Sequence, residues 1–325
     1  MLSRVAESLY WMARYLERAE NTARFINSTT QVLLDLPRGA SFGWDTLLKV
    51  AGLDALYNKH YVTPNEADIM RFLILDERNP GSIFASIHSA RENTRTFREV
   101  LPMEIWERIN GLYLYTRQYA AHATHGRIQR YEVLNNIIER RQSVIGLLVG
   151  SMSHDLAYHF LQLGRSLERA DMSTRIIDVN SAVNLPIDGT SDMARERLWM
   201  STLNALSAYQ MYRQHVGVHV QGPLVAKYLL TDPHFPRTVT HCLGEIENSL
   251  SVLSDYHAPL HAARVAWRRL EAMRFDDVSP AALHEHLDQI QADLANLHDA
   301  ISRKYFSLHQ QVAAQEQHQS SSSTS

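Results

Sequence analysis

The sequence predicts an all-α protein, and three observations lead to that prediction. Apolar residues make up 45% of the 325 positions and recur at the three- to four-residue spacing of amphipathic helices. Glycine and proline are scarce, at 13 and 10 residues, and the short turns that join hairpin strands are nearly absent. An eleven-residue stretch, RYLERAENTAR, also returns half a chain later as RSLERADMSTR. We therefore expect two related multi-helix halves packed about a pseudo-two-fold axis, followed by C-terminal helices.

Turn signals separate the expected helices of the first half. The first helix ends before Leu36-Pro37-Arg38-Gly39, and the third begins at Thr63-Pro64-Asn65-Glu66, where Thr63 is the expected N-cap. Asn79-Pro80-Gly81-Ser82 and Pro102 open the two helices that follow. The expected helices cover about residues 3–32, 42–60, 63–75, 82–100 and 102–123.

Similar signals place the helices of the rest of the chain. Gly126 precedes a connecting helix, Ser151 or Ser153 is expected to cap the next one, and Ser279-Pro280 opens the last. The serine-rich end, residues 316–325, is expected to be disordered because it has no apolar residues to bury. The expected helices cover about residues 127–149, 151–182, 192–215, 222–230, 237–254, 259–273 and 279–310.

The repeated stretch belongs to a series of matches between the two halves. Glu17 and Glu168 are 151 positions apart, Trp44 and Trp199 are 155 apart, and the segments beginning at Pro80 and Pro236 are 156 apart. Three matches in the same order indicate a duplication with small insertions. The expected organisation is a first repeat at 1–125, a connecting helix at 126–150, a second repeat at 151–256, C-terminal helices at 257–315 and the tail at 316–325, with both halves in one compact unit.

Both copies of the repeated helix carry charge on the side opposite their apolar stripe, next to aromatic or apolar residues that a fully solvated face would not favour. The residues concerned are Arg14, Glu17, Arg18, Asn21 and Arg24 in the first copy, and Arg165, Glu168, Arg169 and Arg175 in the second. Pairs within each helix, such as Arg14 with Glu17, Glu20 with Arg24, or Asp171 with Arg175, would contribute only about 0.2–0.5 kcal/mol each in solvent. We therefore expect these charges to lie in an interface.

Several interpretations of the charged side stay open. In one, the Arg and Glu side chains form a buried, mutually paired network that ties the repeats together. In another, some of the arginines face a cleft and bind a carboxylate or phosphate, with Glu17 or Glu168 orienting them. An enzymatic version makes Glu17 or Glu168 a general acid or base. A plain solvated face is the remaining interpretation of the charges, and a purely oligomeric scaffold is a further class of function.

A second charged motif lies at Ala90-Arg91-Glu92-Asn93-Thr94-Arg95, and its counterpart in the second half, Ile246-Glu247-Asn248-Ser249-Leu250-Ser251, has no arginine. A structural requirement of both halves would be kept in both. Arg91, Glu92, Asn93 and Arg95 are therefore candidates for a role that only the first half performs. A surface position or a plain ion pair is the other interpretation.

These motifs give the chain its resemblance to a known family. The segments Leu16-Glu17-Arg18-Ala19-Glu20-Asn21-Thr22-Ala23-Arg24, Ala90-Arg91-Glu92-Asn93-Thr94-Arg95 and Leu167-Glu168-Arg169-Ala170-Asp171 resemble the alpha-E family of helical bacterial proteins, which is named for a Glu-Arg motif. The resemblance covers about residues 1–310. In the second copy Met172 stands where the first has Asn21, so the two copies are not equivalent at that position.

The resemblance also implies partners. Members of the alpha-E family are encoded beside, or fused to, circularly permuted ATP-grasp proteins and transglutaminase-like proteases. The implied role is that of an accessory or binding subunit in a system that forms peptide or amide bonds. The resemblance does not identify a reaction for this chain.

Composition narrows the class of protein further. A formal net charge of -3 argues against a nucleic-acid binder, and no apolar run approaches the length of a membrane span. The single cysteine, Cys242, cannot form an internal disulfide, and the first residues lack a secretory pattern, so a cytoplasmic location is expected.

Cofactor and metal motifs are equally absent from the sequence. No phosphate-binding glycine loop and no Glu-x-x-His spacing occurs, so neither a cofactor nor a metal is expected. Four aromatic residues are expected to be core anchors, namely Trp44, Tyr57, Trp199 and Tyr212. The histidines of the last helix, among them His284 and His298, are expected to be exposed.

Overall fold

The computed structural model describes residues 2–35, 43–183, 191–275 and 279–306, and every regular element in these ranges is a helix, which confirms the all-α prediction. The elements up to the middle of the chain are α1 (Ser3–Asp35), α2 (Asp45–Ala51), α3 (Asp54–Asn58), α4 (Glu66–Ile74), α5 (Ile83–Thr96), α6 (Met103–Tyr119) and α7 (Arg127–Ser151). The later ones are α8 (Leu156–Ala182), α9 (Ser191–Ala205), α10 (Tyr209–His215), α11 (Gly222–Thr231), α12 (Val239–Val252), α13 (His257–Ala272) and α14 (Pro280–Tyr305).

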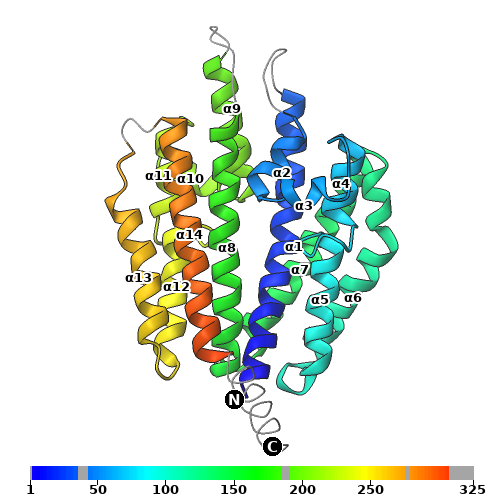
Figure 1. Ribbon diagram of the computed structural model, residues 1–325, viewed down its shortest axis with the longest axis vertical. Coiled ribbons are helices and arrows are strands. Elements are labelled where there is room, and N and C mark those ends of the chain that lie inside the picture. Colours follow the sequence, from blue (N-terminus) through cyan, green and yellow to red (C-terminus); the bar gives the residue numbers. More distant parts are fainter. Residues whose placement is uncertain (1, 36–42, 184–190, 276–278, 307–325) are drawn as a thin grey trace, which may run out of the picture.

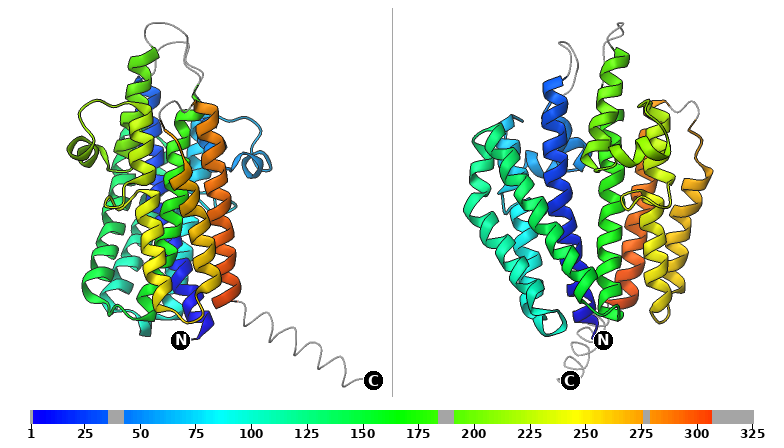
Figure 2. Two further views of the ribbon diagram at one scale, coloured as in Figure 1. Left: turned by 90° about the vertical axis from the view of Figure 1, so that its left-hand side faces the viewer. Right: turned by 180° about the vertical axis from the view of Figure 1, so that it is seen from behind.

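The two long helices α1 and α8 pack side by side in the middle of the molecule (Figure 1). Helices α5, α6 and α7 lie on the side of α1, whereas α12, α13 and α14 lie on the side of α8 (Figure 1). The view from behind shows α7 and α9 on that face of the molecule, and both pack against α1 (Figure 2). The interface between α1 and α8 therefore joins two helical bundles.

The two central helices come very close at Gly164. A Cβ atom added to Gly164 of α8 would lie only 2.1 Å from the carbonyl oxygen of Tyr10 in α1. No real Cβ atom tolerates such a distance, so only glycine allows the two backbones to meet here. This close approach lies near the start of both helices.

The helix starts agree with the sequence predictions in part. Ser279 caps α14 as expected, because its Oγ accepts the backbone N–H of Ala282 at 3.2 Å. The prediction for α4 was wrong by two residues, since Asn65 caps it and accepts the N–H of Asp68. The expected caps Ser151 and Ser153 were also wrong: the carboxylate of Asp155 accepts the first N–H groups of α8.

Two expected helices are each divided in two. The helix expected at 42–60 is broken between α2 and α3 at Gly52, whose φ of 67° is left-handed and cannot continue a helix. The helix expected at 192–215 is broken between α9 and α10 at Ser207, where φ is 54°. A non-glycine residue in this region is uncommon, so no residue type in this segment indicated the second break.

The four expected aromatic anchors differ in how deeply they are buried. Tyr57 and Tyr212 are fully buried, and their hydroxyls donate to the carbonyls of Thr63 and His219 at 3.2 and 2.9 Å. Trp44 and Trp199 are half-buried rather than central.

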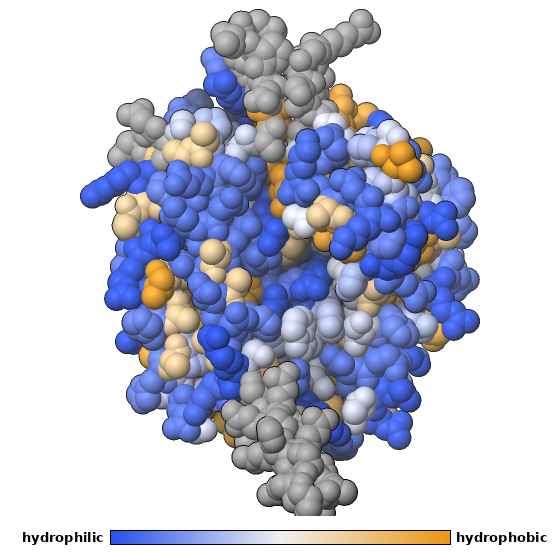
Figure 3. Space-filling view, in the orientation of Figure 1, coloured by the Kyte–Doolittle hydropathy of each residue, from blue (hydrophilic) through white to orange (hydrophobic). Residues whose placement is uncertain are grey.

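On the face shown in Figure 3, hydrophilic residues cover most of the surface and hydrophobic ones form small separate spots.

The expected divisions of the chain map onto the elements as follows. The connecting helix at 126–150 is α7, and the C-terminal helices at 257–315 are α13 and α14, which the structure describes as far as residue 306. The tail at 316–325 lies outside the described residues. Among the described helices, none combines the length and the apolar character that spanning a bilayer would require.

Candidate functional site

The charged side of α1 faces α8 and α7 rather than solvent. Glu17 and Glu20 have no exposed surface, and Glu168 of α8 is only 2% exposed. An unpaired carboxylate in such a position would be very unfavourable, so each one must be neutralised by neighbouring cations. We call the resulting set of paired side chains the ionic belt. It consists of Arg14, Glu17, Arg18, Glu20, Asn21, Arg24, Arg141, Glu168, Arg169 and Arg237.

The first part of the ionic belt is built around Glu168. Arg14 donates its Nε to one carboxylate oxygen at 2.7 Å, and Arg18 contacts both oxygens, at 2.5 and 3.0 Å. The guanidinium of Arg14 also lies over the ring of Trp11, 4.9 Å from its centroid. Two arginines of α1 thus hold one glutamate of α8.

The second part is built around Glu17, and here the direction is reversed. Arg169 of α8 donates Nε and Nη2 to the two oxygens of Glu17 at 2.8 and 3.0 Å, which is a bidentate pair. Arg141 of α7 also donates to Glu17, and Arg237, just before α12, lies within ion-pair distance at 3.4 Å. Three elements distant in sequence therefore converge on one carboxylate.

Glu20 and Asn21 extend this second part along α1. Glu20 accepts from Arg141 and from Arg237, and also from Arg24 at 2.7 Å. The carboxamide oxygen of Asn21 accepts from Arg237 at 2.9 Å, and its amide donates to Glu17 at 3.3 Å. The Asn21 side chain thus bridges an acid and a base, which Met172 at the corresponding place in α8 cannot do.

The carboxylates of the belt are held in their ionised form. Burial alone would raise the pKa of Glu17, but the charges of Arg141, Arg169 and Arg237 hold that pKa well below its usual value. The same balance of burial against arginine charges lowers the pKa of Glu20 and of Glu168 to about 2. A general acid or base works best with a pKa near the operating pH. These glutamates therefore act as fixed negative charges, not as proton carriers.

Positive charge exceeds negative charge in the part of the belt around Glu17 and Glu20. Two carboxylates there face four guanidinium groups, those of Arg24, Arg141, Arg169 and Arg237. Burial, together with the like charges of Arg169 and Arg24, lowers the pKa of Arg237 to about 10 despite its acidic neighbours. The buried Nε of Arg141 has no hydrogen-bond partner in the described part of the chain. A bound anion would offset the excess positive charge and would supply an acceptor for the Arg141 Nε.

A pocket of about 270 Å³ gives such an anion access. The guanidinium-bearing residues Arg24, Arg141, Arg169 and Arg237 line it, and no acidic residue is among the described residues of its wall. Gln142, Ser207 and Pro236 form an exposed rim, and Arg24 donates to the Ser207 hydroxyl at 2.7 Å. We call this cavity the arginine pocket. These arginines outnumber Glu17 and Glu20, with which they pair and which do not line the pocket, so the pocket is suited to a bound carboxylate or phosphate.

Comparison with known families identifies this kind of helical protein. Residues 1–306 match the Alpha-E family, described as "a predicted alpha-helical domain with a conserved ER motif". The chain belongs to the Alpha-E family. The two Glu-Arg pairs at the centre of the ionic belt, Glu17-Arg18 and Glu168-Arg169, both match the ER motif that this description names.

This Alpha-E chain is also similar to uncharacterized proteins of Mycobacterium bovis and Mycobacterium tuberculosis. Each is 22% identical over 329 aligned positions, which cover 91% of this chain. The chain spans 36%, about a third, of the length of these relatives. No solved structure matches it significantly.

The structure places the predicted site residues of this Alpha-E chain in three groups. Most residues of the repeated stretch enter the belt, although Arg14 pairs with Glu168 and not, as the spacing suggested, with Glu17. Arg175 forms the expected pair with Asp171 at 2.9 Å, outside the arginine pocket. Arg165 is near the belt, and its buried Nε has no partner among the described residues. Burial and the charges of Arg169 and Arg141 lower the pKa of Arg165 to about 10.

The second motif lies elsewhere. Arg91 donates to Asn110 at 2.8 Å and to Glu92 at 2.6 Å, and its guanidinium stacks on Tyr113 of α6. Arg95 pairs with the same glutamate, and Asn93 donates to the carbonyl of Ser8 at 3.3 Å. This group ties α5 to its neighbours and does not join the arginine pocket.

Sequence reasoning missed Arg141 and Arg237, two of the four arginines of the pocket. A signal for Arg141 exists, since it interrupts the apolar stripe of α7 between Ile138 and Val144, at helical spacing. A lone charge in such a stripe requires a buried partner. Arg237 gave no comparable signal, because the match between the halves aligned it with Gly81.

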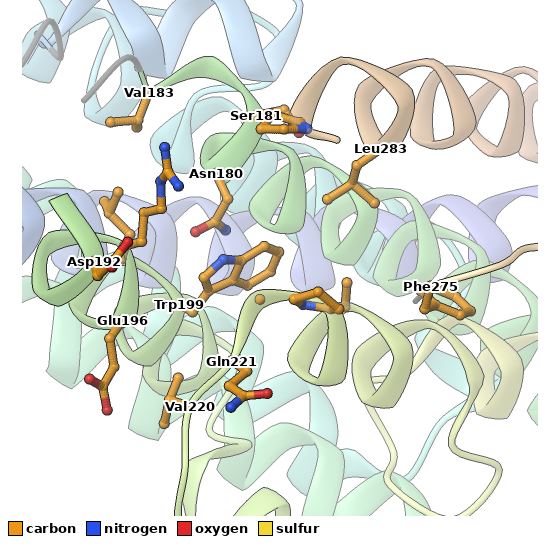
Figure 4. A pocket seen from close by; sticks show the side chains of 16 residues that line it. Asn180, Ser181, Val183, Asp192, Glu196, Trp199, Val220, Gln221, Phe275 and Leu283 are labelled. Atoms are coloured by element: carbon orange, nitrogen blue, oxygen red, sulfur yellow. The ribbon is translucent and has the colours of Figure 1, made fainter. Parts of the chain in front are cut away.

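Two other features of this Alpha-E chain lie apart from the belt. A pocket of about 560 Å³ is lined by Asn180, Trp199, Gln221, Phe275 and Leu283, among others (Figure 4). At the start of α14, ligand atoms of Asp178, His284 and Asp288 lie within 4.8 Å of one another. An ion pair accounts for this second group, since His284 Nδ1 is 2.9 Å from an Asp178 oxygen.

The expected exposure of the last helix's histidines holds for His284 but was wrong for His298. His298 is half-buried against α1, and the Tyr10 hydroxyl lies 2.9 Å from its Nδ1. The reason is that α14 packs its side against both α8 and α1. Aromatic stacking between the Tyr10 and His298 rings, with centroids 5.7 Å apart, reinforces this contact.

Proposed function

We propose that this chain is a non-catalytic binding subunit that holds an anionic group, a carboxylate or a phosphate, in the arginine pocket. The observation that carries this proposal is the imbalance of charge: four arginines line a cavity whose described walls contain no carboxylate. A purely structural network would have no need for this surplus, because every unneutralised buried charge lowers the stability of the fold.

The catalytic alternative has less support. It requires Glu17 or Glu168 to exchange protons with a substrate. Both carboxylates are buried, and arginines occupy the oxygens of both. Their lowered pKa values make them poor proton carriers near neutral pH.

We further propose that the chain works in an amide- or peptide-bond-forming system with a circularly permuted ATP-grasp protein and a transglutaminase-like protease. The resemblance to alpha-E proteins encoded beside such partners supports this role. The chemistry of the pocket agrees with it, since amide formation starts from a carboxylate and guanidinium groups bind carboxylates well. The similar mycobacterial proteins, which are longer than this chain, leave the partners open.

An internal duplication remains part of this proposal. Several features support it: α5 and α12 are both 14 residues long and are capped by Ser82 and Thr238, which are 156 positions apart. The buried Tyr57 donates to the carbonyl of Thr63, 6 positions further on, and the buried Tyr212 donates to that of His219, 7 positions further on. On this reading, the pocket arose where the halves differ, because Arg237 replaces a glycine of the first repeat.

The binding role is tested by anion titration. Phosphate and acetate, with chloride as the reference salt at equal ionic strength, are added to the full chain while its thermal midpoint is measured. A ligand at 100 times its dissociation constant stabilises the folded state by about 2.7 kcal/mol. We expect a rise in the midpoint for phosphate or acetate beyond that for chloride.

A matched pair of variants localises the effect. Arg24→Gln removes a cation of the pocket, whereas Arg175→Gln removes the corresponding i,i+4 partner in α8, which lies outside it. We expect the first variant to lose the anion-specific rise and the second to keep it. Equal responses of the two variants, or no anion-specific rise in the parent chain, would refute the binding role.

The system-level role needs a separate experiment. Co-purification from native extract at low salt, followed by amidoligase assays with and without the chain, should show association with an ATP-grasp-type protein and a change in its rate. If neither association nor a change in rate is found with substrate present, the proposed partners are refuted. The proposed anion site is not affected by that result.

A further inference from the structure

A second cavity continues from the arginine pocket along α1. It has a volume of about 380 Å³ and shares Arg24 with the arginine pocket, and Ala205 in its wall adjoins Leu206 in the wall of the other. We call this cavity the polar groove. We treat the two adjoining cavities as one depression. Helices α1, α7 and α9 line the polar groove, whereas α8 and the segment before α12 also line the arginine pocket.

Helix α1 turns a polar face toward the polar groove, since its lining residues Arg24, Asn27, Ser28 and Gln31 recur at the i, i+3, i+4, i+7 spacing of a single helix side. The facing sides of the other two helices mix polar and apolar residues. Arg197, Ser201 and Asn204 of α9 line the groove with Met200 and Ala205, and Tyr131 and Asn135 of α7 line it with Ile138.

Some polar side chains that line the groove already form hydrogen bonds between the helices. Asn27 of α1 donates to Asn135 of α7 at 3.1 Å, and the hydroxyls of Ser28 and Ser201 lie 2.7 Å apart. These contacts also show that α9 runs antiparallel to α1, since Ser207 meets Arg24 and Ser201 meets Ser28. Arg197 is therefore at the end of the groove remote from the arginine pocket.

Hydrogen-bond donors at that remote end have nothing to bind within the described structure. Arg197 is exposed and makes no ion pair or hydrogen bond with any described residue, and the same holds for the side chain of Gln31 at that end and of Asn204 at the end nearer the arginine pocket. No acidic residue is among the described residues that line either cavity. The whole depression thus presents five arginines and a row of amide donors.

The helix geometry gives the distance between the two cationic ends. Arg24 and Gln31 are seven residues apart on α1, as are Arg197 and Asn204 on α9, and seven residues of α-helix rise about 10 Å. An extended chain of three residues also spans about 10 Å. The depression is therefore longer than a single carboxylate or phosphate requires.

We propose that the ligand of this depression is an extended anion with two negative groups about 10 Å apart, one bound in the arginine pocket and the other at Arg197. The inference rests on the proposed anion-binding function and adds the size and charge pattern of the ligand. A short acidic peptide and a chain of condensed phosphates share this chemistry. The experiment has one arm for each.

The peptide arm uses a pair of ligands that differ by one charge. N-acetyl-Glu-Gly-Gly has its side-chain carboxylate about three residues from its C-terminal carboxylate, and N-acetyl-Gln-Gly-Gly has the same shape without it. Calorimetric titration of the full chain at low salt should show tighter binding of the glutamate peptide, by about fivefold for one exposed charge pair. The phosphate arm compares a linear polyphosphate long enough to span about 10 Å with inorganic phosphate in the same way.

Matched variants assign the difference to the remote end. Arg197→Gln should abolish the preference for the longer anion and leave the affinity for acetate and inorganic phosphate unchanged. Arg268→Gln removes an exposed arginine of α13, away from both cavities, and should keep the preference. Thermal unfolding of both variants checks that the fold is intact.

The outcomes separate this inference from the one on which it rests. Binding of acetate or phosphate without any Arg197-dependent gain for the longer ligand in either arm would overturn the extended-anion inference and leave the anion site in place. If none of the probes binds, the anion-binding function fails and this inference fails with it. An Arg197-dependent gain in one arm supports the inference and identifies the ligand as peptide or phosphate.

Discussion

Replacing Glu17 by glutamine is the most direct test of the ionic belt. The change keeps the shape of the side chain and removes a fully buried negative charge on which Arg141, Arg169 and Arg237 converge. Breaking a buried ion pair by removing one partner costs about 3–5 kcal/mol, because the other charge is left uncompensated. Unfolding free energies of domains are about 5–15 kcal/mol, so the loss is a large fraction of the total.

The corresponding change in thermal midpoint can be worked out from the size of the protein. An unfolding entropy of about 2.1 cal/mol/K per residue, over about 300 ordered residues, gives roughly 0.6 kcal/mol/K. A destabilisation of about 4 kcal/mol therefore lowers the midpoint by about 6 °C. Circular dichroism at 222 nm during heating measures this directly, because the described structure is helical throughout.

A control exists in the other Glu-Arg motif. Glu92 pairs with Arg91 and Arg95 but is about one third exposed, so Glu92→Gln should cost less than about 1 kcal/mol. In the double variant Glu17→Gln with Arg169→Met, one of the arginines left without a partner is also removed. This variant should recover part of the stability lost in Glu17→Gln. A midpoint for Glu17→Gln within 1 °C of the parent chain would refute the view that the belt is a desolvated, mutually dependent network.

Three other outcomes follow from the described contacts. Gly164→Ala should destabilise the protein by about 3 kcal/mol because its methyl group overlaps the Tyr10 carbonyl, whereas Gly146→Ala, with open space around it, should stabilise α7 by up to about 1 kcal/mol; chemical denaturation compares them. The pKa of Glu20 and Glu168 falls to about 2 on folding, so their contribution to stability is complete above about pH 4.5 and disappears as the pH falls toward 2; urea titrations across this range should show the decline. Burial and the charge of Arg14 lower the pKa of His298 to about 4, so the folded state should lose stability between pH 6.5 and 4, and His298→Gln should remove that part of the loss.

Helix class and helix content could be predicted from the sequence because periodicity is a local property. Apolar residues at helical spacing predict the buried side of α1 and of α8. The start of α14 is likewise predicted from the two adjacent residues Ser279 and Pro280. The break at Gly52 had a local signal, a glycine that adopts the left-handed conformation after α2, although the expected helix ran through it. The break at Ser207 had none, because a serine rarely adopts that conformation.

The site was predictable only on the side where the sequence repeats. Glu17 and Glu168 stand out because the same charged stretch occurs twice, and burial of that stretch follows from its aromatic flanks. Their partners do not repeat: Arg141 comes from the connecting helix and Arg237 from a loop 220 positions away from Glu17. A contact between residues so far apart depends on the complete fold, so the arginine pocket could not be assembled from spacing alone.

The long sequence separations within the belt have a consequence for how the chain acquires its structure. Glu17 leaves the ribosome 124 residues before Arg141 and 152 before Arg169, so during synthesis its carboxylate has no lasting counterion. Helices α1 to α6 can gather early through local contacts, but their central face stays hydrated until α8 arrives. We expect residues 1–125 made alone to remain loosely packed around that face, and the two bundles to become rigid together rather than one after the other.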